Sequence, residues 1–339
     1  MQGASNAAQE SGGVGRREPL TRHAAEQYLE SRLGWPMATL MAFPRFFLIE
    51  TINLCNARCI MCGIDFDDKK KIVMSSALFD KITEELAQHA GQVTKVMLYL
   101  DNEPLLDRRL HERVRLLKQA GIVCVNIATN GSILTKNRVT ELIEAGLDEI
   151  YITLDSLHKA TYESIRIGLE FERTYQGILT VIEQRNRMQS ALRIRIQMIL
   201  MAENHQEAET FLGHWKERLK PDDEIVLQKA HNWGNTVPVM TFGDEEQVND
   251  IPCIALWGTM VIHADGQVGL CCVDTGRSHP LGDANRERIE DLWRSPVLEE
   301  IRALHLSCQR TRIPLCNRCT LWRDDKNSLQ RLQSAHEPL

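Results

Sequence analysis

From residue 46 to residue 227 the chain alternates between short apolar runs and longer amphipathic ones. The short runs are rich in β-branched residues and are bounded by polar segments, which predicts strands. The segments between them repeat apolar residues at helical spacing, which predicts helices. The expected strands are 46–51, 95–100, 123–128, 149–154, 193–200 and 224–227, and the expected helices are 75–90, 107–120, 136–145, 174–188 and 204–219.

A strand, helix, strand order that repeats in this way requires right-handed crossovers and a parallel sheet covered by helices. The six expected strands fit a partial, TIM-like (β/α)6 barrel better than a complete eight-unit barrel. Ser76 is expected to cap the first helix, and Gly121 and Gly146 are expected to end the second and third. The sequence therefore predicts an α/β fold.

After about residue 249 the pattern changes to short strands, turns and clustered cysteines. Residues 261–270 alternate around Asp265 and Gly266, which predicts a hairpin, and residues 291–306 have the spacing of one helix. We expect a partial-barrel domain at 19–240 and a small cysteine-rich domain at 241–339. Residues 1–18 are rich in small and polar residues and are expected to form a flexible leader, not a signal peptide.

Composition excludes several functions. The 339 residues are 43% hydrophobic and 25% charged, which is ordinary for a globular protein. A net charge of -6 offers no bulk attraction to nucleic acid or to an acidic membrane. No run reaches the roughly 18 apolar residues that a membrane span needs. We therefore expect a cytoplasmic protein with neither a nucleic-acid partner nor a membrane partner.

The chain contains ten cysteines, and reduced cysteines that cluster usually bind metal or perform redox chemistry. Cys55, Cys59 and Cys62 follow the first expected strand with C-x3-C-x2-C spacing. A structural zinc site closes with four ligands, whereas three thiolates leave one metal position open. An iron-sulfur cluster held in this way can bind a non-protein ligand at its open iron. Cys124, inside an apolar run, is instead expected to be a buried packing cysteine.

This cysteine spacing, its place after the first strand and the barrel pattern together resemble the radical S-adenosylmethionine (SAM) superfamily. The resemblance implies that Cys55, Cys59 and Cys62 hold a 4Fe-4S cluster whose unique iron binds the amino and carboxylate groups of SAM. It further implies that an electron donor such as flavodoxin or ferredoxin drives cleavage of SAM. The 5′-deoxyadenosyl radical formed then abstracts hydrogen from the substrate.

At the end of the second strand the family usually has Gly-Gly-Glu-Pro, whereas this chain has Asp-Asn-Glu-Pro at 101–104. The resemblance implies that Glu103 contacts the methionyl amine of SAM. The loss of two glycines puts the usual close approach of the backbone in doubt. The alternative for Glu103 is an ordinary exposed carboxylate at a strand end.

Thr-Asn-Gly at 129–131 and Thr-Leu-Asp at 153–155 resemble two further signatures of the family. Strand ends of a barrel point polar groups into the active site, so Asn130, Thr153 and Asp155 are candidate contacts to SAM or substrate. The alternative for these residues is turn chemistry. The weaker candidates for binding SAM or substrate are Arg166, Arg195 and Gln197, since an arginine on a barrel strand can pair with the methionyl carboxylate.

A second group of cysteines follows the barrel. Its expected metal ligands are Cys253, Cys271, Cys316 and Cys319, and their spacing alone leaves both zinc and an iron-sulfur cluster open. The surrounding sequence, including Gly266 five positions before Cys271, resembles the SPASM/twitch extension of radical SAM enzymes. The cysteine count resembles the shorter twitch form, which implies one fully ligated auxiliary 4Fe-4S cluster. Its expected role is electron transfer with a substrate radical, and structural support is the alternative.

Two cysteines after the barrel then have no assigned ligand role. A thiol near the active site can donate a hydrogen atom to a carbon radical, which turns radical formation into stereochemical inversion. Cys272 is the candidate donor and Cys308 is a weaker one. Packing in the interior is the alternative for both thiols.

The twitch-like arrangement resembles the aminocyclitol dehydrogenases and aminoglycoside epimerases of antibiotic biosynthesis. It implies hydrogen abstraction from a carbon of a small polyhydroxylated natural product, such as a sugar, aminocyclitol or aminoglycoside. The enzyme would then be an epimerase or an oxidoreductase. A peptide- or protein-modifying SPASM maturase is the alternative, and a non-enzymatic scaffold that binds zinc or an iron-sulfur cluster is a third hypothesis.

Overall fold

The structure, a computed structural model, describes residues 20–64, 70–234, 236–237, 251–317 and 319–321. The expected leader at 1–18 and the expected domain boundary at 240–241 lie outside these residues. Within them, a nine-stranded sheet with the order β11-β10-β9-β1-β3-β4-β5-β7-β8 runs through the molecule. None of the described helices is long and apolar enough to cross a membrane.

Six parallel neighbours in this sheet confirm the predicted partial (β/α)6 barrel. They are β1 (Phe46–Ile49), β3 (Lys95–Met97), β4 (Val125–Thr129), β5 (Glu149–Thr153), β7 (Arg193–Leu200) and β8 (Glu224–Lys229). Successive side chains of a strand point to opposite faces of the sheet. In β7 this buries Ile194, Ile196 and Met198 completely on one face and leaves Arg195 and Gln197 on the other.

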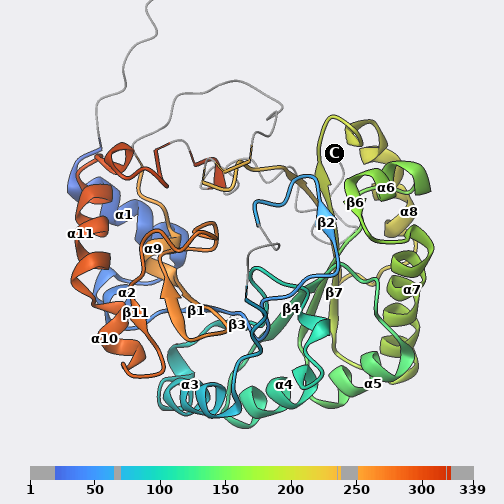
Figure 1. Cartoon of the computed structure of the whole chain (residues 1–339), viewed down its shortest axis with the longest axis horizontal. Coiled ribbons are helices and arrows are strands. Elements are labelled where there is room, and N and C mark those ends of the chain that lie inside the picture. The colour runs from blue at the N-terminus through green and yellow to red at the C-terminus, as the bar shows by residue number, and fades with distance from the viewer. Residues whose placement is uncertain (1–19, 65–69, 235, 238–250, 318, 322–339) are drawn as a thin grey trace, which may run out of the picture.

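Five helices connect these strands and lie in an arc around the outside of the sheet (Figure 1). They are α3 (Ser76–Gln88), α4 (Leu110–Gln119), α5 (Lys136–Glu144), α7 (Phe171–Arg187) and α8 (Ala208–Lys216). Gly121 and Gly146 follow α4 and α5 with φ of 84° and 90°, as predicted, because glycine adopts left-handed backbone without a steric penalty.

The predicted cap of α3 is wrong by one residue. The hydroxyl of Ser75, not that of Ser76, accepts a hydrogen bond from the Leu78 N–H at 3.1 Å. A capping residue must have extended backbone, and Ser76 already belongs to the helix.

Several shorter elements were not expected from the sequence. The helices are α1 (Arg22–Leu33), α2 (Met37–Ala42), α6 (Lys159–Ile165) and α9 (Ala255–Gly258), and the 3-10 turns are η1 (Ala90–Gln92), η2 (Pro104–Leu106), η3 (His205–Glu207) and η4 (Arg310–Arg312). The short strands β2 (Arg58–Cys59) and β6 (Arg166–Ile167) pair antiparallel, with Cys59 opposite Arg166. Strands of two residues are too short for alternation to reveal them.

The cysteine-rich segment continues the same sheet. Strand β9 (Thr259–Ile262) pairs in parallel with β1, and β10 (Gln267–Gly269) pairs antiparallel with β9, which confirms the predicted hairpin. Strand β11 (Gly282–Asp283) forms the edge. The C-terminal helices and α1 lie together at one side of the molecule (Figure 1).

The helix expected at 291–306 is in fact two helices, α10 (Ile289–Trp293) and α11 (Pro296–Leu306). Ser295 caps α11 by accepting a hydrogen bond from the Leu298 N–H. Pro296 has no N–H to continue α10, and it fits the first position of a new helix. The break lets α10 contact α2, where the Trp293 indole N–H donates to the Leu40 carbonyl at 2.9 Å.

A buried ion pair joins α7 to the turn before β8. The guanidinium of Arg185 donates to both carboxylate oxygens of Asp223, each at 2.9 Å, and both side chains are almost completely buried. Asp223 also accepts hydrogen bonds from the Ile194 and Lys220 N–H groups, so it holds together the start of β7 and the turn that leads into β8.

Replacing Arg185 by Ala is expected to lower the free energy of unfolding by about 3–5 kcal/mol, because Asp223 then remains buried without its charged partner. Denaturant titration followed by circular dichroism measures the change. The matched control is Arg173→Ala, which removes an exposed pair with Glu170 (3.2 Å) and should cost less than about 1 kcal/mol. Equal losses in the two variants would contradict this role of Arg185.

Candidate active site

A cavity of about 480 Å³ lies at the carboxyl ends of the six barrel strands. The carboxyl ends of parallel barrel strands meet at one face, which is where such folds place their sites. Ten of the residues predicted as site residues line it. They are Cys55, Cys59, Cys62, Glu103, Asn130, Thr153, Arg166, Arg195, Gln197 and Cys272.

The first cysteines lie in the loop after β1. Cys59 belongs to β2, and the Cys62 N–H donates to the Cys59 carbonyl at 3.0 Å, which makes a tight turn. Burial raises the pKa of Cys55 to about 12 and that of Cys62 to about 11. These thiols would stay protonated at neutral pH unless a bound cation favoured the thiolates. A metal bound by the loop would supply such a cation.

The spacing of the cysteines argues against a single zinc ion. No three of the ten sulfur atoms, all within the described residues, lie within 4.8 Å of one another. A tetrahedral zinc ion with Zn–S bonds of about 2.3 Å brings its sulfur ligands to about 3.8 Å from one another. Neither cysteine group is thus arranged for one zinc ion, and an iron-sulfur cluster is the other group that the cysteine spacing leaves open.

Glu103 is fully held by its neighbours. Its carboxylate accepts hydrogen bonds from the Thr129 hydroxyl (2.7 Å) and from the N–H groups of Asn130 (2.8 Å) and Leu105 (3.0 Å). Burial raises the pKa of Glu103, and these three donors act in the opposite direction. Only 1% of the Glu103 surface is exposed, so the alternative of an exposed strand-end carboxylate is wrong. Glu103 joins the ends of β3 and β4 at the wall of the cavity.

Asn130 takes part in a turn and also lines the cavity. Its side-chain oxygen accepts from the Ser132 N–H (3.0 Å) and hydroxyl (2.7 Å), as the turn alternative predicted. Its amide donates to the side chain of Asn56 at 2.9 Å, which ties the turn to the first cysteine loop. Gly131, at φ 76°, has no room for a side chain because a Cβ would lie 2.9 Å from Ile152.

Arg166 places a positive charge beside the first cysteine loop. Its guanidinium donates to the Cys59 sulfur at 3.4 Å and to a carboxylate oxygen of Asp155. Burial alone would lower the pKa of Arg166, but Asp155 and Cys59 raise it above its usual value. Asp155 itself is completely buried and is not among the residues that line the cavity. It therefore positions Arg166, and its contact with SAM or substrate stays a prediction.

Polar side chains of β5 and β7 line the same cavity as the cysteine loop. The Arg195 guanidinium donates to Glu224 at 2.7 Å and stacks 3.8 Å from the centre of the Tyr151 ring. The Gln197 amide donates to the Thr153 hydroxyl at 2.9 Å. Since Arg195 already has a carboxylate partner, its pairing with the methionyl carboxylate stays a prediction.

Sequence reasoning missed several residues of the cavity wall. They are Tyr99, Tyr151, Gln228, His231 and Trp233. Alternation could have identified two of them, because Tyr151 and Gln228 lie on strands that point every second side chain inward. Burial lowers the pKa of His231 to about 4, so its imidazole is neutral at neutral pH. The Trp233 indole donates to the Met61 carbonyl at 2.7 Å and so closes over the cysteine loop.

The second cysteine group also comes together in space. Burial raises the pKa of Cys271, Cys272 and Cys316. The charges of the nearby Cys253 and Cys319 raise each of these three pKa values further, which places the five cysteines close to one another. The predicted ligands come from the segment before α9, the end of β10 and the segment after η4. The hairpin thus brings Cys271 to the cysteines at both ends of this domain.

The remaining thiols have different surroundings. Cys272 lines the cavity together with the first cysteine loop, whereas Cys271 is not among the lining residues. The Cys308 thiol donates to the Leu20 carbonyl at 3.4 Å, beside the start of α1, and the geometry does not bring it to the cavity. Cys124 is half-buried, so the predicted burial is only partial.

Family profiles match both the barrel and the cysteine-rich segment that follows it. The profile of the radical SAM superfamily matches residues 49–212. The profile of SPASM, an iron-sulfur cluster-binding domain, matches residues 253–320. The first match includes the three-cysteine loop, and the second includes the four cysteines gathered around the hairpin.

Curated relatives match part of the chain. An uncharacterized protein of Treponema pallidum is 26% identical over 66% of this chain and 63% of its own length. The GTP 3′,8-cyclase of Limosilactobacillus fermentum is 29% identical over 50% of each protein. The chain therefore spans between one half and 63% of the length of these relatives.

Solved structures share the fold over more of the chain. BtrN in complex with AdoMet and 2-DOIA has a TM-score of 0.56 and 18% identity, and the match covers 82% of this chain and 93% of BtrN. Streptococcus suis SuiB bound to the precursor peptide SuiA has a TM-score of 0.64 and 14% identity, and the match covers 77% of this chain and 67% of SuiB. At these identities the likeness shows the fold alone.

Proposed function

Because the chain belongs to the radical SAM superfamily and carries a SPASM domain, we propose that it removes a hydrogen atom from a carbon of a compact polyhydroxylated substrate and inverts that carbon. The substrate class is a sugar, an aminocyclitol or an aminoglycoside. The position of Cys272 carries this proposal, because the thiol lines the same cavity as Cys55, Cys59 and Cys62. A hydrogen-atom donor is thus available where the substrate radical would form.

The two domains imply SAM, a SAM-binding 4Fe-4S cluster and an auxiliary 4Fe-4S cluster. Cys55, Cys59 and Cys62 would hold the first cluster. The auxiliary cluster would be held by Cys253, Cys271, Cys316 and Cys319. When bound, the first cluster and SAM supply the 5′-deoxyadenosyl radical that takes the hydrogen atom. The chain's own residues must orient the reactants, exclude water and control the fate of the substrate radical.

The cavity wall suits a polar, compact substrate. Hydroxyl and amide groups of Tyr99, Thr153 and Gln197 offer hydrogen-bond donors and acceptors to substrate hydroxyls. A volume of about 480 Å³ is in the range of small-molecule sites. SAM and the first cluster would take part of that volume, which favours a compact substrate over an extended peptide.

The proposed inversion balances in atoms and electrons. One electron from a flavodoxin- or ferredoxin-type donor cleaves SAM to methionine, and the substrate hydrogen ends on 5′-deoxyadenosine. The Cys272 S–H then delivers a hydrogen atom to the opposite face of the substrate carbon. A second electron, from a donor of the same flavodoxin or ferredoxin type, and one proton restore the thiol. Each inversion thus consumes one SAM, two electrons and one proton.

Two alternatives remain within the superfamily. In a dehydrogenation, the substrate radical would lose one electron to the auxiliary cluster and one proton to a base, giving a ketone. In a peptide maturase the same radical chemistry would act on a side chain. The structural neighbours include BtrN, solved with AdoMet and 2-DOIA, and SuiB, solved with a precursor peptide, so the fold is compatible with a small molecule and with a peptide.

Turnover in deuterated water tests the proposal. The anaerobically reconstituted protein is incubated with SAM, a chemical reductant and a panel of aminoglycosides, aminocyclitols and sugar nucleotides. We expect a product that carries one solvent deuterium at the inverted carbon, because a thiol exchanges its proton with solvent.

The other outcomes separate the alternatives. A ketone formed with one 5′-deoxyadenosine per product would indicate dehydrogenation. GTP belongs in the panel because of the cyclase relatives, and its conversion would replace the proposed substrate class. If every small molecule gave SAM cleavage without a product, the peptide hypothesis would become the favoured one.

A further inference from the structure

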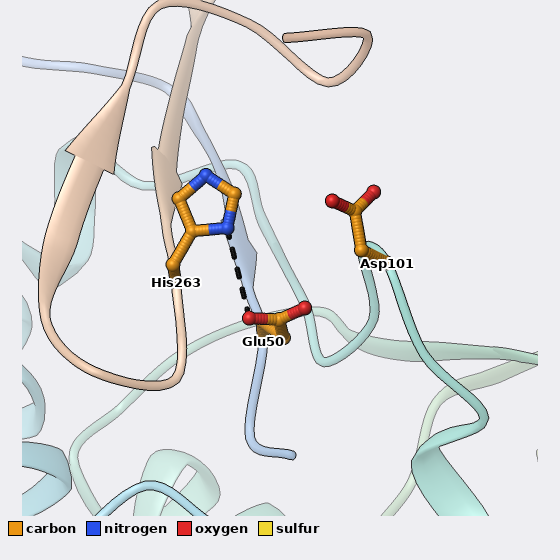
Figure 2. A group of neighbouring side chains, drawn as sticks. All are labelled: Glu50, Asp101 and His263. Carbon is orange, nitrogen blue, oxygen red and sulfur yellow. Dashed lines mark ion pairs between the residues drawn. The ribbon is translucent and has the colours of Figure 1, made fainter. Parts of the chain in front are cut away.

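Three buried side chains with metal-binding groups lie together outside both cysteine groups. Glu50 follows β1, His263 follows β9 and Asp101 follows β3, and these three strands are neighbours in the sheet. One ligand atom from each residue lies within 4.8 Å of the other two (Figure 2). Glu50 is 0% exposed, and Asp101 and His263 are each 1% exposed. None of the three is among the residues that line the cavity.

Glu50 and His263 have binding capacity that the described residues do not use. One carboxylate oxygen of Glu50, Oε2, accepts from the Ala264 N–H at 3.0 Å. The other, Oε1, has no hydrogen-bond partner, and neither ring nitrogen of His263 has one. Figure 2 shows the imidazole on one side of the Glu50 carboxylate, and the free carboxylate oxygen directed toward the side where Asp101 lies. Buried polar atoms without partners are costly, so a missing ligand is the natural explanation.

The separation between Glu50 and His263 fits two ligands of one ion better than a hydrogen-bonded pair. Their closest atoms, Oε2 and Nδ1, are 3.6 Å apart, which is too long for a hydrogen bond. A metal ion with bonds of about 2.0–2.2 Å holds adjacent ligand atoms about 3–3.5 Å apart. Two carboxylates would carry two negative charges, which a divalent cation balances. Carboxylate oxygens with an imidazole nitrogen suit Mn²⁺, Fe²⁺ or Zn²⁺.

The hairpin leaves room for the imidazole at this position. A Cβ on Gly269 would lie only 2.9 Å from His263 Nε2, so the absence of a side chain there allows the ring to lie across the strand pair. The Glu50 N–H also donates to the Ile262 carbonyl at 2.9 Å, which fixes the end of β1 beside the residue before His263. The backbone of β1 and of the hairpin therefore fixes the positions from which Glu50 and His263 extend.

We propose that Glu50, Asp101 and His263 bind one divalent transition-metal ion, distinct from the iron-sulfur clusters. The ion would join two strands of the barrel to the hairpin of the SPASM domain. The assignment does not depend on the substrate of the enzyme, because it rests on residues outside the cavity.

Titration with Mn²⁺ tests the site, since Mn²⁺ prefers oxygen and nitrogen ligands to thiolates. The full chain, with both clusters loaded anaerobically, is titrated while electron paramagnetic resonance reports free Mn²⁺. We expect one bound Mn²⁺ per chain and a loss of affinity of at least about tenfold in Glu50→Gln and in His263→Asn. The matched control is Glu290→Gln, which alters another carboxylate–histidine pair (3.0 Å to His89) and should leave binding unchanged.

Thermal unfolding of the wild-type protein tests the site even if a variant does not fold. Binding of Mn²⁺ to the native state must raise the thermal midpoint of the wild-type protein, and a chelator must reverse the rise. Iron content and circular dichroism establish that each variant retains its clusters and fold. Absence of a stoichiometric site in the wild-type protein at millimolar Mn²⁺, or equal binding by the wild type and the folded Glu50 and His263 variants, would overturn the proposal.

Discussion

The variant in which Cys55, Cys59 and Cys62 are all replaced by Ala is expected to lose reductive cleavage of SAM completely. These thiols come from one loop and line the cavity, and no other described thiol of the barrel domain does so. Without them the loop could not hold the cluster that binds SAM. The measurement is 5′-deoxyadenosine formed under anaerobic conditions with a strong chemical reductant, with iron and sulfide analysis in parallel.

Iron analysis makes this prediction quantitative. Two 4Fe-4S clusters correspond to about eight irons per chain, and the variant should retain about four in the auxiliary cluster. The control is Cys124→Ala, because Cys124 is a half-buried barrel thiol outside both groups and should keep full iron content and full cleavage. Cleavage of SAM that survives the triple replacement, or bound zinc without sulfide in the wild-type protein, would refute the assignment of this loop.

Replacing Cys272 by Ala is expected to abolish the inverted product while 5′-deoxyadenosine continues to form. The substrate radical would still be generated, because the first cysteine loop is intact, but no hydrogen atom would be returned to it. The measurement is the ratio of product to 5′-deoxyadenosine with the substrate identified in the panel. Cys308→Ala is the control, since its thiol contacts the Leu20 carbonyl outside the cavity and should not change this ratio.

Iron content separates two roles of Cys272. The Cys253 and Cys319 charges that act on Cys271 also act on Cys272, so a ligand role would cost the variant about four irons. Retention of about eight irons together with uncoupled SAM cleavage supports a hydrogen donor. Loss of the auxiliary cluster would assign Cys272 as a ligand, and unchanged turnover would remove it from the mechanism.

The sequence by itself determined the features that depend on short windows of the chain. The strand and helix alternation predicted the six parallel strands, and the turn residues Asp265 and Gly266 predicted the hairpin. The cysteine spacing placed Cys55, Cys59 and Cys62 in one loop after β1. These features could be predicted because periodicity, turn chemistry and ligand spacing are all encoded within a few neighbouring residues.

Only the tertiary structure decided which distant residues meet. Asp155 pairs with Arg166 and does not line the cavity, and Cys272 is in the cavity whereas Cys308 is outside it. Sequence reasoning named all four as candidates. The meeting of Glu50 with His263 depends on β9 pairing with β1, far apart in the chain. Such contacts follow from the order of strands in the sheet, and the packing of the whole chain sets that order, which no local pattern encodes.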